Sequence, residues 1–371
     1  MKFLFLEPFY GGSHRSFADG MIAHSSHAFD LITLPARFWK WRMRGAALVF
    51  ARKVPKPEEY AGVFATDLMS VADLKAMWGG RCPPVLLYFH ENQFSYPLGP
   101  EATPDYQFGF THMSSALAAE AVRFNSRTHQ DAFFTALSEF LNMMPDCRPR
   151  WIVPKIRAKS DVLYPGFRLA RDDELSTDMD SRKDSPPIIV WNHRWEHDKN
   201  PRDFFEALKA LQARGLKFRL ALLGQRFQNT PPEFVEARDR FKAEIVCYGY
   251  RKSRSQYEDW LRRGAVVVST ARQENFGMAV IEAIRCGCYP LLPNRLSYPE
   301  IVPPRFHADV LYEDPSDLIE KMIAVADNID HTLEIRTKMA RSMEKYCWRE
   351  RIGDFDRALT QLVETTQKGK K

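Results

Sequence analysis

The sequence lacks long apolar runs, metal-binding cysteine clusters and internal repeats. No hydrophobic stretch approaches the roughly 18 residues of a membrane-spanning helix. The cysteines are scattered, and the one close pair has no histidine pair at ligand spacing beside it: Cys82, Cys147, Cys247, Cys286, Cys288 and Cys347. These absences argue against a membrane-spanning chain, a disulfide scaffold and a zinc site. They predict a protein of the reducing cytoplasm without stable membrane association.

What the sequence does contain is enough apolar material for two cores. It has 371 residues, of which 45% are hydrophobic and 13% aromatic. At roughly 150 residues per domain, this length predicts about two domains. The opening stretch MKFLFLEPFYGG is broken by Glu7 and Pro8, so it predicts a first strand and its loop rather than a signal peptide. The net charge of +6 permits a polyanionic partner without requiring one.

Short apolar runs alternate with helical stretches in the first half of the chain. The predicted strands are KFLFLEPF (2–9), FDLITLP (29–35), GVFAT (62–66) and PVLLYFH (84–90), and residues 108–126 are expected to be helical. This alternation is typical of a parallel sheet with helices on both faces. A polar stretch ending in two prolines, residues 170–187, follows and is the predicted linker.

A second alternating series begins after the linker. Its predicted strands lie within residues 187–194, 218–224, 243–249, 265–270 and 288–293, separated by helices that include residues 200–215 and 255–264. The expected fold class is therefore α/β, with two doubly wound Rossmann-like domains facing an interdomain cleft. We assign residues 1–169 to the first domain and 188–345 to the second. Residues 346–371 are expected to form a helix and basic tail that could cross back to the first domain.

Two glutamates flank a predicted helix start in the second domain. Glu274 precedes the helix that begins near Phe276 and Gly277, continues with Met278, and carries Glu282 further along. A helix N-terminus attracts phosphate, and carboxylates accept hydrogen bonds from sugar hydroxyls. The segment therefore suits a nucleotide sugar, although E-x7-E alone is also typical of a solvated helix face.

Two cations follow the first strand of the second domain. Arg194 and Lys199 lie between this strand and the next helix, where they could stabilise a diphosphate leaving group as charge develops on it. The competing interpretation is a pair of exposed loop cations.

Polar residues also follow two strands of the first domain. Gly11 and Gly12 come directly after the first strand and would let a ligand approach the backbone, with His14 within reach of the cleft. His90 ends the predicted strand 84–90, and Glu91 and Asn92 follow it. Their position favours a site over a structural role for His90, and we expect His14, Glu91 and Asn92 to contact the acceptor.

Residues 37–53 are rich in cations and contain no acidic residue. Lys40, Arg42 and Arg44 are interleaved with aromatic residues that include Trp41. Aromatic side chains can stack on exposed RNA bases while cations hold phosphates. The alternatives are core aromatics with solvated cations, or a membrane-surface helix.

Together these constellations resemble the retaining glycosyltransferases of the GT-B fold that use nucleotide-sugar donors. The resemblance rests on the glycine loop, the FHEN motif, Arg194, Lys199 and the E-x7-E pair, and it extends over nearly the whole chain. It implies that Arg194 and Lys199 hold the diphosphate, Glu282 the ribose and Glu274 the transferred sugar, with His90 near the reacting centre. It implies no metal and no other cofactor.

Several longer segments resemble the amino-terminal domain of the tRNA-queuosine α-mannosyltransferase family. They are EPFYGGSH, LPARFWKWRMRGAALVFA, YFHENQFSYP, DYQFGF and MMPDCRP. This resemblance implies that a hexosyltransferase moves mannose from GDP-mannose to the cyclopentene-diol of queuosine, at the wobble position of tRNA(Asp). The partners so implied are the anticodon loop of that tRNA and the nucleotide sugar.

Retention of configuration requires either a covalent intermediate or departure and attack on one face of the sugar. No residue stands out as a nucleophile, so we favour same-face substitution assisted by the leaving phosphate. Three alternatives remain open at this point. They are a lipid or polysaccharide acceptor, a nucleotide-sugar epimerase of the same fold, and an RNA-binding protein with a decayed transferase site.

Overall fold

The computed structural model describes residues 1–95, 105–168, 186–225 and 230–368. The chain divides into two compact units, both of which contain a six-stranded parallel sheet covered by helices. Unit 1 comprises Met1–Phe167 and Tyr346–Lys371, and unit 2 comprises Arg168–Lys345. This architecture confirms the predicted fold class. The predicted linker 170–187 lies outside the described residues except for its last two positions, as does the tail from residue 369.

The sheet of unit 1 has the order β2-β1-β3-β4-β5-β6, and every neighbouring pair is parallel. Its strands are β1 (Lys2–Tyr10), β2 (Ala28–Pro35), β3 (Gly62–Thr66), β4 (Val85–Phe89), β5 (Ala121–Phe124) and β6 (Ser160–Val162). The strands β3 and β4 are buried along their whole length, as expected of a parallel sheet covered on both faces. The strand order reverses between β1 and β3.

One sequence prediction for unit 1 is confirmed and one needs correction. The strand predicted over residues 2–9 matches β1, in which Glu7 pairs in register with Thr33. The predicted helix over 108–126 ends at Ala118, and its last part is the strand β5. The short stretch AVRF is compatible with a strand as well as with a helix, and pairing with β4 and β6 decides for the strand.

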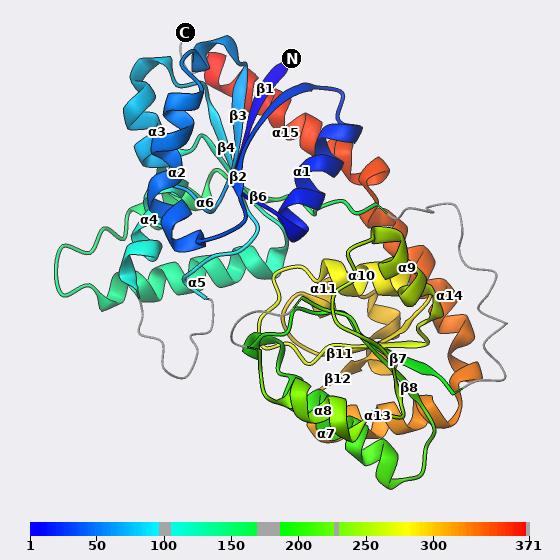
Figure 1. Cartoon of the computed structure of the whole chain (residues 1–371). Helices are drawn as coiled ribbons and strands as arrows, with labels where there is room; N and C mark the ends of the chain where they lie inside the picture. Colours follow the sequence, from blue (N-terminus) through cyan, green and yellow to red (C-terminus); the bar gives the residue numbers. More distant parts are fainter. Residues whose placement is uncertain (96–104, 169–185, 226–229, 369–371) are drawn as a thin grey trace. The chain divides into compact units, whose positions relative to one another are not determined.

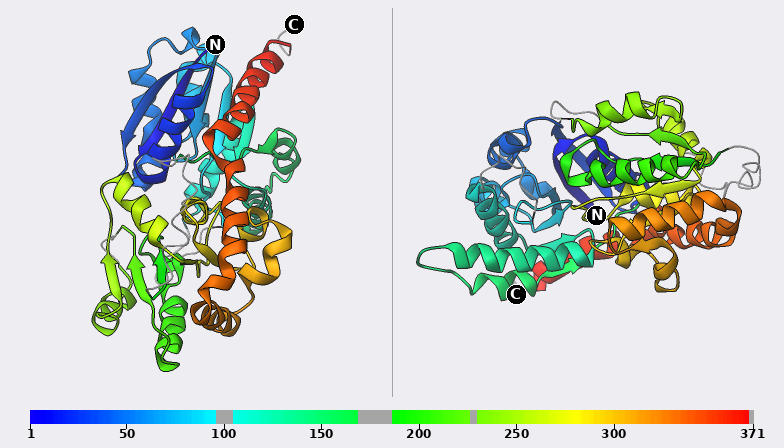
Figure 2. Two further views of the ribbon diagram at one scale, coloured as in Figure 1. Left: turned by 90° about the vertical axis from the view of Figure 1, so that its right-hand side faces the viewer. Right: turned by 90° about the horizontal axis from the view of Figure 1, so that it is seen from below.

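Helices cover both faces of this sheet (Figure 1). One face is covered by α2 (Trp39–Lys53), α3 (Val71–Trp78), α4 (Tyr106–Ala118), α5 (Arg127–Met143) and α6 (Ile152–Arg157). The other face is covered by α1 (Gly12–His24) and by α15 (Trp348–Lys368), although α15 is the last helix of the chain. Figure 2 shows α15, in red, alongside the strands of unit 1.

Trp348 anchors α15 to unit 1. Its side chain is 1% exposed and packs against Phe17 and Phe355, with ring centroids 5.4 Å apart in each case. Gly20 and Gly166 leave room for the indole ring, because a Cβ atom at either position would overlap it. The C-terminal residues therefore belong to the core of the first unit.

The sheet of unit 2 has the order β12-β11-β10-β7-β8-β9, again parallel throughout. Its strands are β7 (Ile188–Trp191), β8 (Arg219–Leu222), β9 (Ile245–Tyr248), β10 (Val266–Val268), β11 (Tyr289–Pro293) and β12 (Leu311–Tyr312). The strand order reverses between β7 and β10. Ligands of doubly wound sheets bind beside the carboxyl ends of strands at such a reversal.

The helices of unit 2 form two groups, which Figure 1 shows on either side of the sheet. The first group is α7 (Pro201–Ala213), α8 (Glu233–Arg240) and α13 (Pro315–Asp327). The second is α9 (Arg254–Arg263), α10 (Met278–Arg285) and α14 (Leu333–Ser342). Two shorter helices, α11 (Tyr298–Ile301) and α12 (His307–Val310), join β11 to β12. Across the described residues, no helix is both long and apolar enough to cross a bilayer.

Candidate functional site

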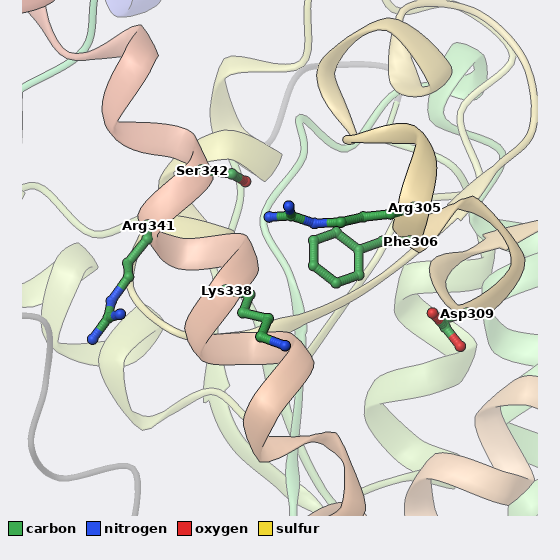
Figure 3. A pocket seen from close by; sticks show the side chains of 6 residues that line it. All are labelled: Arg305, Phe306, Asp309, Lys338, Arg341 and Ser342. Carbon is green, nitrogen blue, oxygen red and sulfur yellow. The ribbon is translucent and has the colours of Figure 1, made fainter.

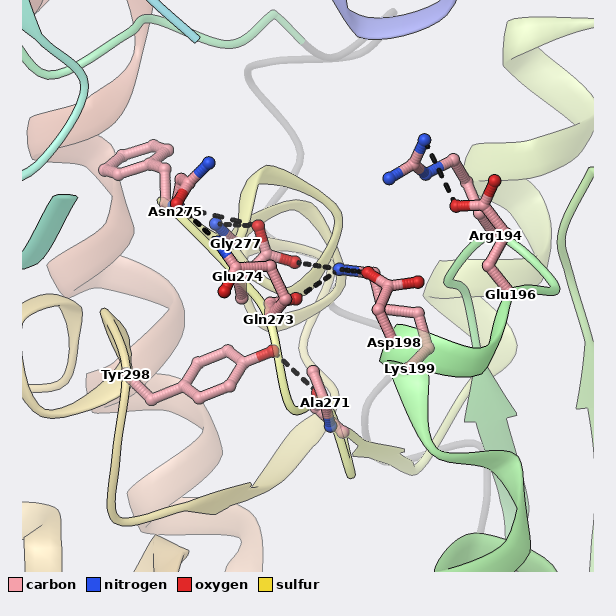
Figure 4. Close-up of polar contacts among 12 residues, drawn as sticks. Arg194, Glu196, Asp198, Lys199, Ala271, Gln273, Glu274, Asn275, Gly277 and Tyr298 are labelled. Carbon is pink, nitrogen blue, oxygen red and sulfur yellow. Dashed lines mark hydrogen bonds and ion pairs between the residues drawn. The ribbon is translucent and has the colours of Figure 1, made fainter. Parts of the chain in front are cut away.

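Lys199 joins the two loops that follow β7 and β10. It ends the short 3-10 helix η4 (His197–Lys199) and is only 6% exposed. Its ammonium group donates to the carbonyl oxygen of Gln273 at 2.6 Å and lies 3.3 Å from Glu274 Oε2 and 3.2 Å from Asp198 Oδ2 (Figure 4). A buried cation is thus held at the strand-order reversal of unit 2.

Glu274 lies at the start of α10. Its Oε1 accepts the backbone N–H of Gly277 at 3.0 Å, while Oε2 faces Lys199. Burial by itself would raise the pKa of Glu274, but the charges of Lys199 and His193 and the hydrogen bonds from Lys199 and Phe276 lower it below its usual value. The carboxylate is therefore ionised and caps a helix end that the sequence assigned to phosphate.

The predicted helix start near Phe276 and Gly277 agrees with the structure. Gly277 is the N-cap, with a φ of 92° that an L side chain rarely adopts, and α10 begins at Met278. Phe276 is buried and Met278 is partly buried. Any phosphate contact of these three residues stays a prediction.

Arg194 differs from Lys199 in its environment. It follows β7 on the same loop, but its side chain is 47% exposed and its guanidinium lies 3.2 Å from Glu196 Oε2. In Figure 4 the Arg194 side chain extends away from the cluster around Lys199. One cation is therefore buried among three acceptors, and the other is about half exposed beside a carboxylate.

Glu282 is held by two side chains that the sequence did not reveal. It is 7% exposed, Arg254 donates to its Oε1 at 2.6 Å, and the Tyr257 hydroxyl donates to its Oε2 at 3.2 Å. Asn192, just after β7, donates to the Tyr257 oxygen at 3.1 Å. Since a carboxylate has about four acceptor sites, Glu282 keeps capacity for a ribose hydroxyl.

Arg254 connects this carboxylate to a second one. Its Nε donates at 2.7 Å to Glu258, which is fully buried one turn further along α9. Burial would lower the pKa of Arg254, but the charge of Glu282 outweighs it and raises the pKa. No spacing in the sequence links residue 254 to residue 282, because the contact joins α9 to α10.

The glycine turn of unit 1 is shaped by steric constraints. A Cβ atom on Gly11 would overlap the methyl group of Ala36, and Gly12 has a φ of 52°. The turn lets α1 begin directly after β1, which brings His14 over the end of the sheet. Contact of Gly11 and Gly12 with the donor stays a prediction.

The rings of His14 and His90 pack against each other at a tilt of 48° at the strand-order reversal of unit 1. Their ring centroids are 4.3 Å apart, and the backbone N–H of His90 donates to Asp67 Oδ1 at 2.9 Å. His14 Nδ1 lies 3.3 Å from the carboxylate of Glu7, a fully buried residue of β1 that the sequence analysis treated only as a break. Burial and the neighbouring His14 and His129 lower the pKa of His90 well below its usual value.

The two residues after His90 have different surroundings. Glu91 is partly buried, and its Oε1 accepts a hydrogen bond from the Gln93 side chain at 3.3 Å. Asn92 is fully buried, and its Oδ1 accepts the backbone N–H groups of Phe94 and Ser95 at 3.1 and 3.0 Å. The predicted acceptor contact suits Glu91, whereas the oxygen of Asn92 is used to shape the loop.

The basic aromatic segment is helical and exposes part of its aromatic surface. Phe38 and Trp41 are 68% and 78% exposed, so they are not core residues. Trp39 packs inward, with its ring 5.0 Å from that of Phe108, and Phe50 further along α2 belongs to the core. We call these exposed residues and the neighbouring cations the α2 face, comprising Arg37, Phe38, Lys40, Trp41, Arg42 and Arg44.

Two of its cations are anchored at one point each. Arg44 donates to the Thr111 hydroxyl of α4 at 3.1 Å, and Arg42 donates to the Pro35 carbonyl oxygen at 3.3 Å. The Lys40 ammonium lies 5.7 Å from the centroid of the Trp39 ring. Each cation retains further donors for an anionic partner.

A separate hollow of about 550 Å³ lies on unit 2. The residues that line it come from other parts of the sequence than the residues described above. It is lined by Arg305, Phe306, Asp309, Lys338, Arg341 and Ser342, and its cations extend from exposed positions (Figure 3). It contains none of the predicted site residues.

Comparison with known proteins identifies the family. A model described as "tRNA-queuosine alpha-mannosyltransferase N-terminal" matches residues 2–167, and one described as "Glycosyl transferases group 1" matches residues 175–346. The tRNA-queuosine alpha-mannosyltransferase of Drosophila melanogaster is 36% identical over 330 residues, covering 86% of this chain and 85% of the fly protein. The chain belongs to the tRNA-queuosine alpha-mannosyltransferase family. It is thus a glycosyltransferase, as the sequence predicted, and not an epimerase.

Solved structures agree on the fold of this tRNA-queuosine alpha-mannosyltransferase family member. Sucrose-phosphate synthase from Thermosynechococcus elongatus superposes with a TM-score of 0.76 at 14% identity, covering 98% of this chain and all of that one. HepE of Anabaena in complex with UDP-glucose gives a TM-score of 0.66, also at 14% identity and covering the same shares. At such low identity these neighbours support the two-domain GT-B architecture alone.

Proposed function

We propose that the chain transfers mannose from GDP-mannose to the cyclopentene-diol of queuosine, at the wobble position of tRNA(Asp), with retention. Family membership supports this reaction class and acceptor. The guanine base, the hexose and the tRNA species are inferred from the resemblance and await the assay described below. A tRNA substrate also fits a cytoplasmic protein without stable membrane association.

Unit 2 would hold the donor. Lys199 offers a buried ammonium whose three donors face Gln273, Glu274 and Asp198. A diphosphate that replaces one of these acceptors would be stabilised by the cation as it gains negative charge during departure. The exposed Arg194 would close onto the same diphosphate. With two cations available, we propose that no metal is required.

Glu274 fits hydroxyl binding better than nucleophilic attack. Its carboxylate accepts from Gly277 and Lys199, and donors of this kind reduce the nucleophilicity of an oxygen. Its remaining lone pairs can accept from hydroxyls of the sugar, as those of Glu282 can from the ribose. We therefore propose same-face substitution, with the leaving phosphate accepting the proton of the acceptor hydroxyl.

Unit 1 would hold the acceptor, and the α2 face is the observation that carries this part of the proposal. Exposing two aromatic rings to water costs free energy unless a partner covers them. Cations surround these rings, and no acidic residue lies among them. Stacking on an unpaired base is worth roughly 1–3 kcal/mol, and the cations would hold the phosphates on either side. The anticodon loop presents both features, and the α2 face lies within the part of the chain that the queuosine-specific family model matches.

A transfer assay tests the proposal. Purified protein would be incubated with queuosine-bearing tRNA and a panel of nucleotide sugars, and the digested nucleosides would be analysed by mass spectrometry. We expect one hexose on queuosine, from GDP-mannose only, and no product with tRNA that lacks queuosine. Donor hydrolysis without tRNA labelling would refute the acceptor and favour the lipid or polysaccharide alternative, for which liposome flotation of the protein is the next measurement.

A Trp41→Ala variant separates acceptor binding from donor chemistry. We expect a tRNA KM raised about tenfold, equivalent to about 1.4 kcal/mol, with unchanged donor hydrolysis. Trp151→Ala is the matched control, because Trp151 is also exposed beside a cation, Lys155, but lies outside the α2 face. An equal effect of both substitutions would mean that the α2 face is not the specific contact.

A further inference from the structure

Glu7 is an acidic residue inside the first strand of unit 1, and none of its surface is exposed. Its Oε1 accepts the backbone N–H of Phe9 at 2.8 Å, and its Oε2 accepts the Thr66 hydroxyl at 3.1 Å. A buried carboxylate is costly unless it is hydrogen-bonded and paired with a charge. The hydrogen bonds are in place, and the remaining partner is His14.

The ring of His14 is fixed by this carboxylate on one side. Its Nδ1 lies 3.3 Å from Oε1 and 3.4 Å from Oε2 of Glu7, while its ring centroid is 4.3 Å from that of His90. With Nδ1 directed at Glu7, the other ring nitrogen remains available to a ligand. Because His14 is itself about 9% exposed, a ligand at the end of the sheet could reach that nitrogen.

We propose that Glu7 is a positioning residue that orients the ring of His14 beside His90, so that the second ring nitrogen of His14 can donate to a hydroxyl of the acceptor diol. This inference rests on the proposed function for its ligand, although the pairing of Glu7 with His14 stands on geometry alone. A charged His14 donates through both ring nitrogens, one to Glu7 and one to a hydroxyl oxygen, while a neutral His90 adds no competing charge.

The electrostatics of the cluster support this division of protonation states. Burial alone would lower the pKa of His14, but the charge and hydrogen bond of Glu7 outweigh it and raise the pKa to about 9, with Asp67 and Glu91 contributing. His14 thus stays protonated at neutral pH. His90 stays neutral, because burial and the charge of His14 both oppose its protonation. Because the pKa of His14 is higher in the folded state than in the unfolded state, its protonation stabilises the fold at pH values below the unfolded-state pKa. This stabilisation is lost as the pH rises through about 9.

The test is the pH profile of transfer by a Glu7→Gln variant. Glutamine keeps the shape and one acceptor but removes the charge, so the pKa of His14 should fall to its ordinary range of about 6.5 or lower. We expect kcat/KM for tRNA at pH 8 to fall by about tenfold or more, and the loss to become smaller as the pH falls toward the lowered pKa of His14. Donor hydrolysis without tRNA should remain unchanged.

Glu120→Gln is the matched control. Glu120 is another carboxylate of unit 1 that accepts a backbone N–H, that of Val85 at 2.7 Å, and faces Lys75, but it is not among the groups that act on His14. It should leave the pH profile unchanged. A uniform loss of activity at every pH in both variants would overturn the proposal, since that result indicates damage to the fold.

A second measurement keeps the inference testable if the variant does not fold. Burial raises the pKa of Asp67 to about 8 against the opposing charge of His14, so Asp67 titrates in a similar pH range. The pKa of His14 must therefore be observed directly. NMR titration of labelled histidines in the wild-type protein, assigned with His14→Gln, should show one ring that titrates near pH 9. A normal His14 pKa would overturn the inference even if tRNA transfer is confirmed.

The same titration distinguishes a bound metal from an ion pair. The ligand atoms of Glu7, His14 and His90 all lie within 4.8 Å of one another, as metal ligands also do. If elemental analysis finds a stoichiometric divalent metal in purified protein, and chelation restores a titrating His14, the proposal is wrong. Metal-free protein with the raised pKa supports it.

Discussion

Replacing Lys199 with methionine should destabilise unit 2 and abolish transfer. The substitution removes the charge but keeps an unbranched side chain of similar length. It leaves Glu274 and Asp198 as buried carboxylates without the cation that faces both of them. Breaking a buried pair costs roughly 3–5 kcal/mol. Glu274 keeps the N–H of Gly277 and is 19% exposed, so we expect the lower end, about 3 kcal/mol.

The pH dependence of this loss has a defined sign. The lowered pKa of Glu274 contributes stability above the usual glutamate range, and that contribution disappears as the pH falls through the folded-state pKa. Without Lys199, burial should raise the pKa of Glu274, so that its carboxylate takes up a proton in mild acid. The destabilisation should therefore be largest at pH 7.5 and smaller near pH 5.

Hydrogen exchange measured by mass spectrometry reports the opening free energy of α10 peptides separately from those of unit 1. A Lys199→Met/Glu274→Gln double variant should recover part of the lost stability, because one uncompensated charge is removed as well. Transfer should remain absent in both variants. Equal protection of α10 in wild type and Lys199→Met, or fully additive single substitutions, would refute the ion pair as a stabilising contact.

Three further predictions concern other parts of the molecule. Arg254→Met should raise the donor KM about tenfold through Glu282 while changing kcat little, as measured by steady-state kinetics; an unchanged donor KM would rule out this role. Trp348→Ala should destabilise unit 1 by about 3–5 kcal/mol in protection against exchange, whereas unit 2 peptides should be unaffected. Glu282→Gln should weaken binding of the nucleoside diphosphate in calorimetry more than it weakens binding of mannose 1-phosphate, and an equal loss for both ligands would contradict ribose binding.

Apolar patterning identified most strands of both sheets. Runs such as GVFAT and AVVVST carry this information locally, because a strand covered on both faces must be apolar throughout. The pattern misplaced β5, since residues 121–124 continue an alanine-rich helix without a turn signal. It placed β1 correctly although the strand contains Glu7, a carboxylate that is unfavourable there until His14 and Thr66 provide partners.

The candidate site divides in the same way. The sequence by itself determined which residue types stand at or after the strand ends, including Lys199, Glu274, Glu282, His14 and His90. The apolar pattern shows where each parallel strand ends, and the residues of the following loop can then be named. Only the tertiary structure decided their partners. Arg254 meets Glu282, and Glu7 meets His14, through contacts between separate elements whose register and packing no local spacing encodes. Folding likewise decided the exposure of Trp41. The sequence does not distinguish an aromatic residue of the core from one that binds a ligand, and only packing shows which helix face is buried and which is exposed.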